Sequence, residues 1–453
     1  MLPFTLPMVL TALLACTGKQ PTGDDSAVET PGPHNVLLLV SDDIGVEISA
    51  CYPDQGVARA PQPRLQRLCA QGVAFDHAWS APVSSPTRAG MLTGREGWRT
   101  GVGEAQDDDV LTALDAGERS LPAALALGGA PHASGMVGKW HLGSDPASPN
   151  LAGWLHFAGA LLGEVPDYYA WDEVVDGTTT PVSTYATTRT VDQALSFIQG
   201  QQDTPWVLWV AFNAPHTPLH LPPTSLQGYD DLSGTEDDIT ARPARYYQAM
   251  VQAMDSEIGR LLDGIDPSVM ANTDIIYLGD NGTAGLVNQG FVPNDHAKAS
   301  LYAGGVHVPL FVTGPDVVDP GRRVDAPVES LDLFATILDL AGADRAAATT
   351  GLDLDAASLL PYLQDPQAAP QRSTVLAEIF GPRTDADHQG RAMSDGHYKL
   401  LSVQARGEEL YDLQEDPLEQ HDLLVAGALS EEAQVAHDAL QGALAALPAL
   451  PAE

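Results

Sequence analysis

The sequence predicts an α/β fold: a large, mostly parallel sheet flanked by helices, followed by a smaller C-terminal antiparallel sheet with a closing helix. From residue 34 onward, short apolar runs rich in β-branched residues alternate with stretches of helical periodicity, which is the pattern of layered domains with a parallel sheet. After about residue 366 the runs become short strands separated by turn residues, and an alanine-rich amphipathic stretch closes the chain. We therefore expect one domain over 34–365 and a smaller subdomain over 366–453.

Polar side chains follow four of the predicted strands, at the point where each strand ends. The strands are 36–40, 134–137, 206–212 and 275–278, and the groups that follow them are Asp42 and Asp43, Lys139 and His141, His216, and Asp280 and Asn281. In open α/β sheets, ligands bind beyond the carboxyl ends of the strands. We therefore expect these groups to lie together in one site.

Helical periodicity marks the segments between the strands. These segments are 63–72, 190–199, 246–262 and 331–341, and the closing helix is expected over 429–447. Their apolar residues recur three and four positions apart, so each helix is expected to bury one face. Residues 224–245 are polar and acidic, and we expect a surface loop or lid there.

The stretch 83–95, VSSPTRAGMLTGR, predicts a helix with an anion-binding end. Pro86 favours a first helical turn, because its missing N–H would have no partner there in any case. Ser84 then lies at the helix N-terminus, where free N–H groups favour an anion, and Arg88 lies about one turn further on the same side. An ordinary serine-capped helix with a surface arginine is the alternative.

Two acidic pairs supply oxygen ligands at strand ends: Asp42 with Asp43, and Asp280 with Asn281. Carboxylate oxygens combined with an amide oxygen suit Ca²⁺ or Mg²⁺ better than zinc. For either pair alone, a solvated turn is the alternative. Two pairs that each end an apolar strand favour a metal site.

The overall charge is strongly negative. The 453 residues include 22 Lys and Arg against 60 Asp and Glu, which gives a net charge of −38. Such a chain repels nucleic acid and anionic membrane surfaces, so any site for an anion must be locally basic. The chain has four lysines, which are Lys19, Lys139, Lys298 and Lys399.

Positive charge and titratable groups are nevertheless present among the candidate site residues. Lys139, Lys298 and Arg88 supply the positive charge, and His141 and His216 add groups that titrate near neutral pH. A hydrogen-bonded structural role is the alternative for each histidine. Because both histidines follow predicted strands, we favour a functional role.

The N-terminus predicts export. Residues 1–15 are apolar and too few to span a membrane, and Leu13-Leu14-Ala15-Cys16 resembles a bacterial lipobox, in which Cys16 carries the lipid. Residues 16–33 are rich in Pro, Gly, Thr and Asp, as in a flexible linker. We expect an exported protein, periplasmic or anchored to the outer membrane at Cys16; a simply cleaved signal peptide is the alternative.

The two other cysteines, Cys51 and Cys69, leave two alternatives open. They pair in a disulfide if the compartment is oxidising, or each is a small buried thiol. Neither lies in a CxxC or zinc-binding pattern.

Taken together, these residues resemble the sulfatase family of the alkaline-phosphatase-like superfamily, over about 35–423. The family signature is Cys or Ser, any residue, Pro, any residue, Arg, followed by Leu-Thr-Gly-Arg, and it stands here as Ser84 to Arg88 and Leu92 to Arg95. Further matches in the family's order are GKWHLG (138–143), APHTP (214–218), GDNG (279–282), YxGGxxVP (302–309), YKL (398–400) and ELYDLxxDPxE (409–419). The resemblance implies an alkaline-phosphatase-like fold.

The resemblance also implies the chemistry of Ser84. In the family this residue is oxidised after synthesis to formylglycine, here by an oxygen-independent maturase because the residue is a serine. One hydroxyl of the hydrated aldehyde attacks sulfur, and the other allows sulfate to be expelled afterwards. A plain serine has no such release step.

The remaining family roles carry over onto matching positions. Asp42, Asp43, Ser84, Asp280 and Asn281 would hold Ca²⁺, or Mg²⁺. Arg88 would anchor residue 84 and the sulfate, and Lys139 and Lys298 would stabilise charge on the sulfate. His141 would accept the proton during release, and His216 with Lys298 would protonate the leaving alcohol.

The expected function is hydrolysis of a sulfate monoester, either a small molecule or a sulfated glycan. A phosphomonoesterase, phosphodiesterase or phosphonate hydrolase on the same scaffold is one alternative. A non-catalytic lipoprotein that binds sulfated glycans, with Ser84 unmodified, is the other. Specificity is expected in loops around 100–120, 160–185 and 224–245, which carry no readable code for the substrate.

Overall fold

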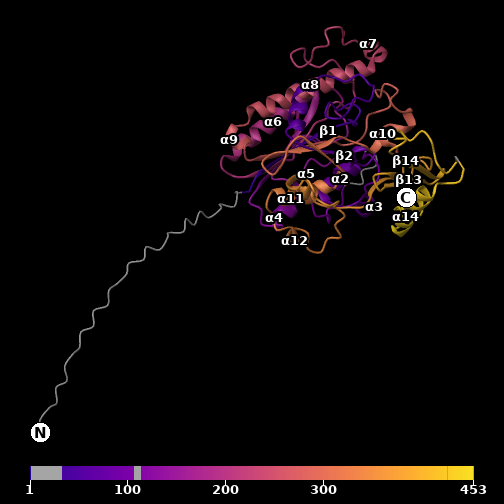
Figure 1. The fold of residues 1–453 in the computed structure, drawn as a ribbon. Coiled ribbons are helices and arrows are strands. Elements are labelled where there is room, and N and C mark those ends of the chain that lie inside the picture. The colour runs from indigo at the N-terminus through magenta and orange to yellow at the C-terminus, as the bar shows by residue number, and fades with distance from the viewer. Residues whose placement is uncertain (2–32, 107–113, 426, 452–453) are drawn as a thin grey trace, which may run out of the picture. The chain divides into compact units, whose positions relative to one another are not determined.

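A mixed sheet with parallel central strands forms the centre of the fold (Figure 1). The computed structural model describes residue 1 and residues 33–106, 114–425 and 427–451. Within these residues the strand order of the large sheet is β10-β2-β9-β8-β1-β7-β3-β4-β5-β6. The strands are β1 (Asn35–Ser41), β2 (Gly72–Trp79), β3 (Ala133–Lys139), β4 (His156–Ala160), β5 (Trp171–Val175), β6 (Thr178–Val182), β7 (Trp206–Ala211), β8 (Thr273–Gly279), β9 (Leu310–Thr313) and β10 (Arg322–Glu329).

Helices cover both faces of this sheet, as Figure 1 shows. On one face lie α1 (Pro63–Ala70), α6 (Ala186–Gln201), α8 (Pro243–Gly264) and α9 (Pro267–Met270), and on the other α2 (Ser84–Thr93), α4 (Leu121–Leu127), α11 (Asp332–Leu340) and α12 (Arg345–Ala348). The remaining short helices are α3 (Gly97–Thr100), α5 (Ser148–Leu151), α7 (Glu236–Ala241), η1 (Asn294–His296), α10 (Ala303–Val306) and α13 (Leu360–Gln364). The predicted layered α/β architecture is confirmed.

Strand β1 lies in the middle of the sheet and is buried on both faces. It pairs in parallel with β7 on one side and β8 on the other, with Val36 opposite Val207 and Leu37 opposite Ile275. Its side chains alternate between two cores: Val36 and Leu38 join the α2 and α11 side, whereas Leu37 joins the α6 and α8 side. A strand that is buried on both faces has apolar residues at every position instead of at every second one. The sequence 36–40 has this continuous apolar pattern.

The C-terminal part is a separate antiparallel sheet with one helix. Its strands are β11 (Val375–Ile379), β12 (Gly390–Ser394), β13 (Tyr398–Val403) and β14 (Gly407–Asp412), in that order, and the helix is α14 (Glu431–Ala446). Leu440 of α14 packs on Leu400 and Leu410, while the opposite face of the sheet packs on Trp79 and Leu301. The predicted second sheet and closing helix are confirmed; residue 366 as the boundary between domains stays a prediction.

Two of the expected loops contain regular structure. Residues 224–245 include α7. The Thr235 side chain caps this helix by accepting a hydrogen bond from the N–H of Asp238. Three acidic residues lie in its first turn, where the helix dipole is positive and stabilises negative charge. Residues 160–185 include the β5–β6 hairpin, which extends the sheet edge. Both segments are therefore more ordered than the sequence predicted.

The predicted leader, the lipidation site at Cys16 and the linker lie outside the described residues, apart from residues 1 and 33. In the ranges that the structure describes, no helix is long and apolar enough to span a membrane. Cys51 and Cys69 are both free thiols, and each is partly buried.

Candidate active site

The four polar strand ends meet at one edge of the sheet. β8, β1, β7 and β3 are neighbours in that order, and all pair in parallel, so their carboxyl ends lie side by side. The N-terminus of α2 approaches the same edge, as does the loop before α10 that carries Lys298. Residues from these six segments, including Ser84 of α2 itself, are thereby brought to one site.

Ser84 is the first residue of α2. The preceding Val83 is extended, so the helix begins at Ser84, as the sequence predicted. The Ser84 hydroxyl is buried and lies 3.2 Å from both Asp42 Oδ1 and Asn281 Oδ1. The Lys139 ammonium donates to the same hydroxyl across 3.2 Å. Residue 84 is thus the point on which two oxygen ligands and one cation converge.

Arg88 is fully buried, which excludes the alternative of a surface arginine. Its guanidinium donates to Asp280 Oδ2 and to the carbonyl oxygen of Lys139, each across 2.8 Å. These two bonds join α2 to the ends of β8 and β3. Arg88 lies one turn from Ser84 on the same side of the helix, so its positive charge faces the site.

Asp43 is held in a conformation that L-residues avoid. Its φ is 64°, in the left-handed region, where a non-glycine residue is strained and therefore a pointer to function. The surrounding structure fixes it: its N–H donates to Asp280 Oδ1 across 3.2 Å, and the Tyr247 hydroxyl donates to its carbonyl across 2.6 Å. Tyr247 lies on α8, and sequence reasoning did not identify it.

Cations keep the Asp43 carboxylate ionised. Burial alone would raise the pKa of Asp43, but the charges of Lys298 and His216 outweigh burial and lower it. Lys298 forms a direct ion pair with Asp43, and His216 Nε2 lies 3.9 Å from Asp43 Oδ2. Lys139 pairs with Asp42 Oδ2 at 2.6 Å in a fully buried contact.

The surroundings of His141 favour the neutral form of its ring. Its Nε2 donates to the carbonyl of Gln106 across 3.0 Å, so in the neutral ring Nδ1 is the acceptor. Burial, and then the charges of Lys139 and Arg88, hold the pKa of His141 well below its usual value. Its φ is 59°, also in the left-handed region. The ring is packed so closely against Gly163 that a Cβ there would lie 2.6 Å from Nε2.

The donor set fits a hard divalent cation. The residues Asp42, Asp43, Asp280 and Asn281 are each at most 4% exposed. One ligand atom each from Asp42, Asp43 and His216 lie within 4.8 Å of one another. Buried oxygen donors of this kind suit Ca²⁺ or Mg²⁺. This candidate metal-binding cluster lies at positions that the sequence singled out.

A cavity of about 650 Å³ opens onto these groups. Its lining includes Ser84, His141, His216 and Lys298, and in addition Gln106, Glu164 and Arg383, which sequence reasoning missed. Gln106 falls in the segment 100–120, where a specificity loop was expected but no residue could be chosen. Arg383 comes from the C-terminal subdomain, so only the tertiary structure could place it here.

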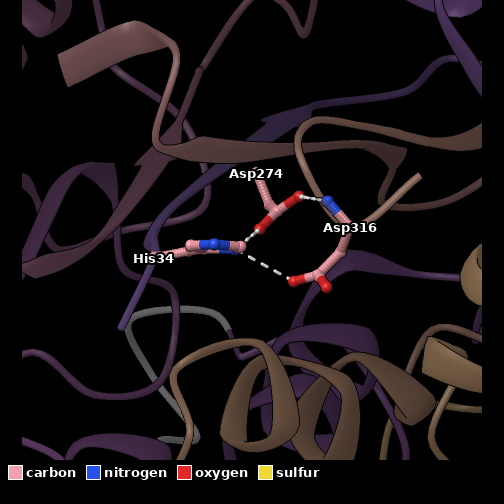
Figure 2. A group of neighbouring side chains, drawn as sticks. All are labelled: His34, Asp274 and Asp316. Carbon is pink, nitrogen blue, oxygen red and sulfur yellow. Dashed lines mark hydrogen bonds and ion pairs between the residues drawn. The ribbon is translucent and has the colours of Figure 1, made fainter. Parts of the chain in front are cut away.

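A second group of titratable residues lies at the opposite edge of the same strands (Figure 2). His34 precedes β1, Asp274 is the second residue of β8, and Asp316 follows β9. His34 Nδ1 lies 3.1 Å from Asp274 Oδ2 and 3.0 Å from Asp316 Oδ2. Burial, and then the charge of Asp316, raise the pKa of Asp274 to about 6. This cluster joins the starts of two strands to a loop.

Comparison with known proteins assigns the family. Residues 34–343 match the sulfatase family model, and residues 295–445 match the model described as N-sulphoglucosamine sulphohydrolase, C-terminal. The chain is 30% identical over 419 residues to N-acetylgalactosamine-6-sulfatase of Sus scrofa, and the match covers 82% of this chain and 74% of that protein.

Solved structures share the fold. The chain resembles Ps i-CgsB, solved in complex with k-i-k-neocarrahexaose, with a TM-score of 0.73 and 24% identity over 87% of this chain and 89% of that one. It also resembles a protein solved with its substrate D-glucosamine-2-N,6-O-disulfate, with a TM-score of 0.72 and 19% identity over 91% and 97% of the two chains. Because the family model spans most of the chain and the fold agrees, this protein belongs to the sulfatase family and is a sulfuric ester hydrolase.

Proposed function

We propose that the protein hydrolyses a sulfate monoester of a carbohydrate through a formylglycine formed from Ser84. The observation that carries the proposal is the convergence on the Ser84 hydroxyl of Asp42 Oδ1, Asn281 Oδ1 and the Lys139 ammonium, each at 3.2 Å. Of these three groups, the Lys139 ammonium would stabilise an ionised nucleophile, and the two oxygens would position the hydroxyl and serve as ligands for a metal ion beside it. An oxygen-independent maturase would carry out the conversion of the serine.

The basic residues would bind the sulfate group. Arg88, Lys139 and Lys298 place three cations around residue 84 in a chain whose net charge is −38. Fixed cations aimed at the oxygens of a reacting ester stabilise charge that develops during the reaction. His216, beside Lys298 in the cavity, would protonate the leaving alcohol.

His141 would take the proton when sulfate is released. A general base must be unprotonated at the working pH, and the lowered pKa of His141 keeps its ring neutral. Its Nδ1 is buried and has no hydrogen-bond partner among the described residues, so it is available as an acceptor.

Asp42, Asp43, Asp280 and Asn281 would hold Ca²⁺ or Mg²⁺, with residue 84 as a further ligand. When bound, the ion would lower the pKa of the nucleophilic hydroxyl and neutralise negative charge. The ion pair with Lys298 would keep the Asp43 carboxylate ionised and ready to bind it, and the Lys139 ammonium would hold the Asp42 carboxylate in place at 2.6 Å.

The names of the similar proteins support a carbohydrate substrate. One relative is an N-acetylgalactosamine-6-sulfatase, and two structural neighbours were solved with a disulfated glucosamine and a neocarrahexaose. The predicted leader supports an exported location, either periplasmic or anchored through Cys16. A sulfated glycan or a fragment of one is therefore the substrate that we propose.

Two measurements test the proposal. Mass spectrometry of the peptide spanning residues 81–88, from protein made in its native host, should show serine minus two hydrogens at position 84. The same protein should hydrolyse sugar sulfates and an aryl sulfate faster than a phosphodiester. Ser84→Ala should lower kcat/KM by at least about 10³-fold, whereas Ser134→Ala, a buried serine at the other end of β3, should not.

The outcomes separate the alternatives. Faster cleavage of the phosphodiester would support a phosphoesterase on the same scaffold. An unmodified Ser84 without turnover, combined with binding of sulfated glycans, would support a binding lipoprotein and contradict the proposal.

A further inference from the structure

The Gln106 side chain lines the cavity beside Ser84 and has one buried atom without a partner among the described residues. The residue is 3% exposed, it lines the cavity, and its Oε1 forms no hydrogen bond with any described residue. Buried polar groups in native proteins are almost always paired, so each exception requires an explanation. Because Gln106 also lines the cavity, a donor on a bound substrate would satisfy this atom.

The backbone of Gln106 is fixed from two sides. Its N–H donates to the Ser85 hydroxyl across 3.0 Å, and its carbonyl accepts from His141 Nε2 across 3.0 Å. Ser85 directly follows the nucleophile position, and His141 is the expected proton acceptor. Gln106 therefore stands at a defined position relative to the two groups that act on the substrate.

The segment that carries Gln106 is also clamped to the C-terminal subdomain. The N–H of Phe380 donates to the carbonyl of Gly103 across 3.0 Å, and the Glu104 carboxylate accepts from the hydroxyl of Thr384 across 2.9 Å. These bonds hold the loop that brings Arg383 to the cavity. A binding group on a supported segment can discriminate between ligands, because it cannot move away from a poor fit.

We propose that Gln106 is a specificity residue, whose side-chain amide accepts a hydrogen bond from a hydroxyl or acetamido N–H of the sugar that carries the sulfate. The proposal rests on the proposed function and names the group that recognises the alcohol part of the substrate. An aryl sulfate offers no donor of this kind, whereas a sugar ring offers several. Sites that hydrogen-bond a substrate hydroxyl reject analogues that lack it, because their own polar group is then left unpaired.

The test compares two substrate classes in formylglycine-loaded enzyme. Gln106→Leu keeps the approximate size of the side chain and removes its hydrogen bonds, and Gln106→Glu keeps an acceptor oxygen. We measure kcat/KM for the 6-sulfates of N-acetylgalactosamine, galactose and N-acetylglucosamine, and for 4-nitrophenyl sulfate. Gln62→Leu is the matched control, since Gln62 is also buried but its amide donates to the Ile48 carbonyl and does not line the cavity.

The expected result is a change in the ratio of the two activities. Gln106→Leu should lower kcat/KM for the best sugar sulfate about 10- to 100-fold more than for the aryl sulfate. Gln106→Glu should restore part of the preference for the sugar sulfate over the aryl sulfate. Gln62→Leu should leave that preference as it is in the wild-type enzyme.

Two results would overturn the role of Gln106. Equal losses on both substrates would show that Gln106 acts only by positioning His141, and no loss on either would show no role. If the wild-type enzyme hydrolyses the aryl sulfate but none of the sugar sulfates, the proposed carbohydrate substrate fails together with this role. The first two results leave the proposed function intact.

Discussion

The carboxylates at the two ends of β1 and β8 have opposite protonation behaviour. Beyond the carboxyl ends, Asp43 is buried and its pKa is lowered. At the amino ends, Asp274 is equally buried and its pKa is raised to about 6. Burial raises the pKa of both groups, so the difference comes from their partners.

Lysine ammonium groups distinguish the two regions. At the carboxyl ends, Lys298 pairs with Asp43 and Lys139 pairs with Asp42. At the amino ends, Asp274 faces His34 and a second carboxylate, Asp316 (Figure 2). The proposed metal and sulfate site thus has lysine ammonium groups beside its carboxylates, whereas the carboxylates of the cluster that joins the strands face a histidine and each other.

The largest effect is expected from removing a cation at the carboxyl end. Lys139→Met leaves the buried Asp42 carboxylate without its partner, which should cost about 3–5 kcal/mol of unfolding free energy. It should also lower kcat/KM by about 10²- to 10³-fold, because a fixed charge near the reacting group is lost. Urea denaturation and steady-state kinetics measure the two effects.

Lys399→Met is the matched control for this substitution. Lys399 is also fully buried and pairs with Glu419 at 2.6 Å, but it lies in the C-terminal sheet. We expect comparable destabilisation with activity retained in the folded protein. Equal losses of activity in both variants would mean that Lys139 acts only through stability.

Removal of the metal should give the next largest effect. Treatment with a calcium chelator should abolish sulfate ester hydrolysis, and Ca²⁺ at 100 times its Kd should restore it and stabilise the fold by about 2.7 kcal/mol. Isothermal titration calorimetry and thermal denaturation measure binding and stabilisation. Asp280→Asn should weaken both responses, and Asp274→Asn should leave them unchanged; a calcium response that depends on Asp274 would contradict the assignment of the two regions.

The smallest effect concerns the amino-end cluster, which consists of His34, Asp274 and Asp316, and the pH dependence of the stability that it contributes. Because the folded pKa of Asp274 is about 6, above the ordinary value of 3.8, its contribution to stability is greatest at low pH and is lost as the pH rises through about 6. Between about pH 5 and pH 8 this should amount to about 1.4 kcal/mol. Asp274→Asn stays neutral and should remove that part of the pH dependence in urea denaturation.

A histidine–aspartate pair at the surface provides the comparison. His77 and Asp325 lie 2.9 Å apart, with Asp325 92% exposed, so Asp325→Asn should leave the pH dependence unchanged. If Asp274→Asn behaves in the same way, the amino-end cluster is solvated like a surface pair, and burial does not control its protonation.

Much of the fold could be predicted because its signals are local. The run 36–40 is apolar throughout, which indicates a strand buried on both faces, and the segment 246–262 has the spacing of one helix face. The segment 224–245 was harder, because a short capped helix such as α7 depends on one side-chain bond from Thr235 and has little periodicity. The β5–β6 hairpin was missed for a similar reason, since the strand 178–182 is mostly exposed and carries no apolar alternation.

The sequence by itself determined the family, the layered fold and the residue types that gather around Ser84, because these depend on motifs and periodicities within short stretches. The tertiary structure decided which groups touch: Arg88 on Asp280, His141 on Gln106, and Tyr247 on the strained backbone of Asp43. It also decided that equally buried aspartates differ in pKa, and that Oε1 of the cavity-lining Gln106 has no hydrogen-bond partner among the described residues. These properties depend on distances between residues far apart in the chain, and a linear pattern does not encode such distances.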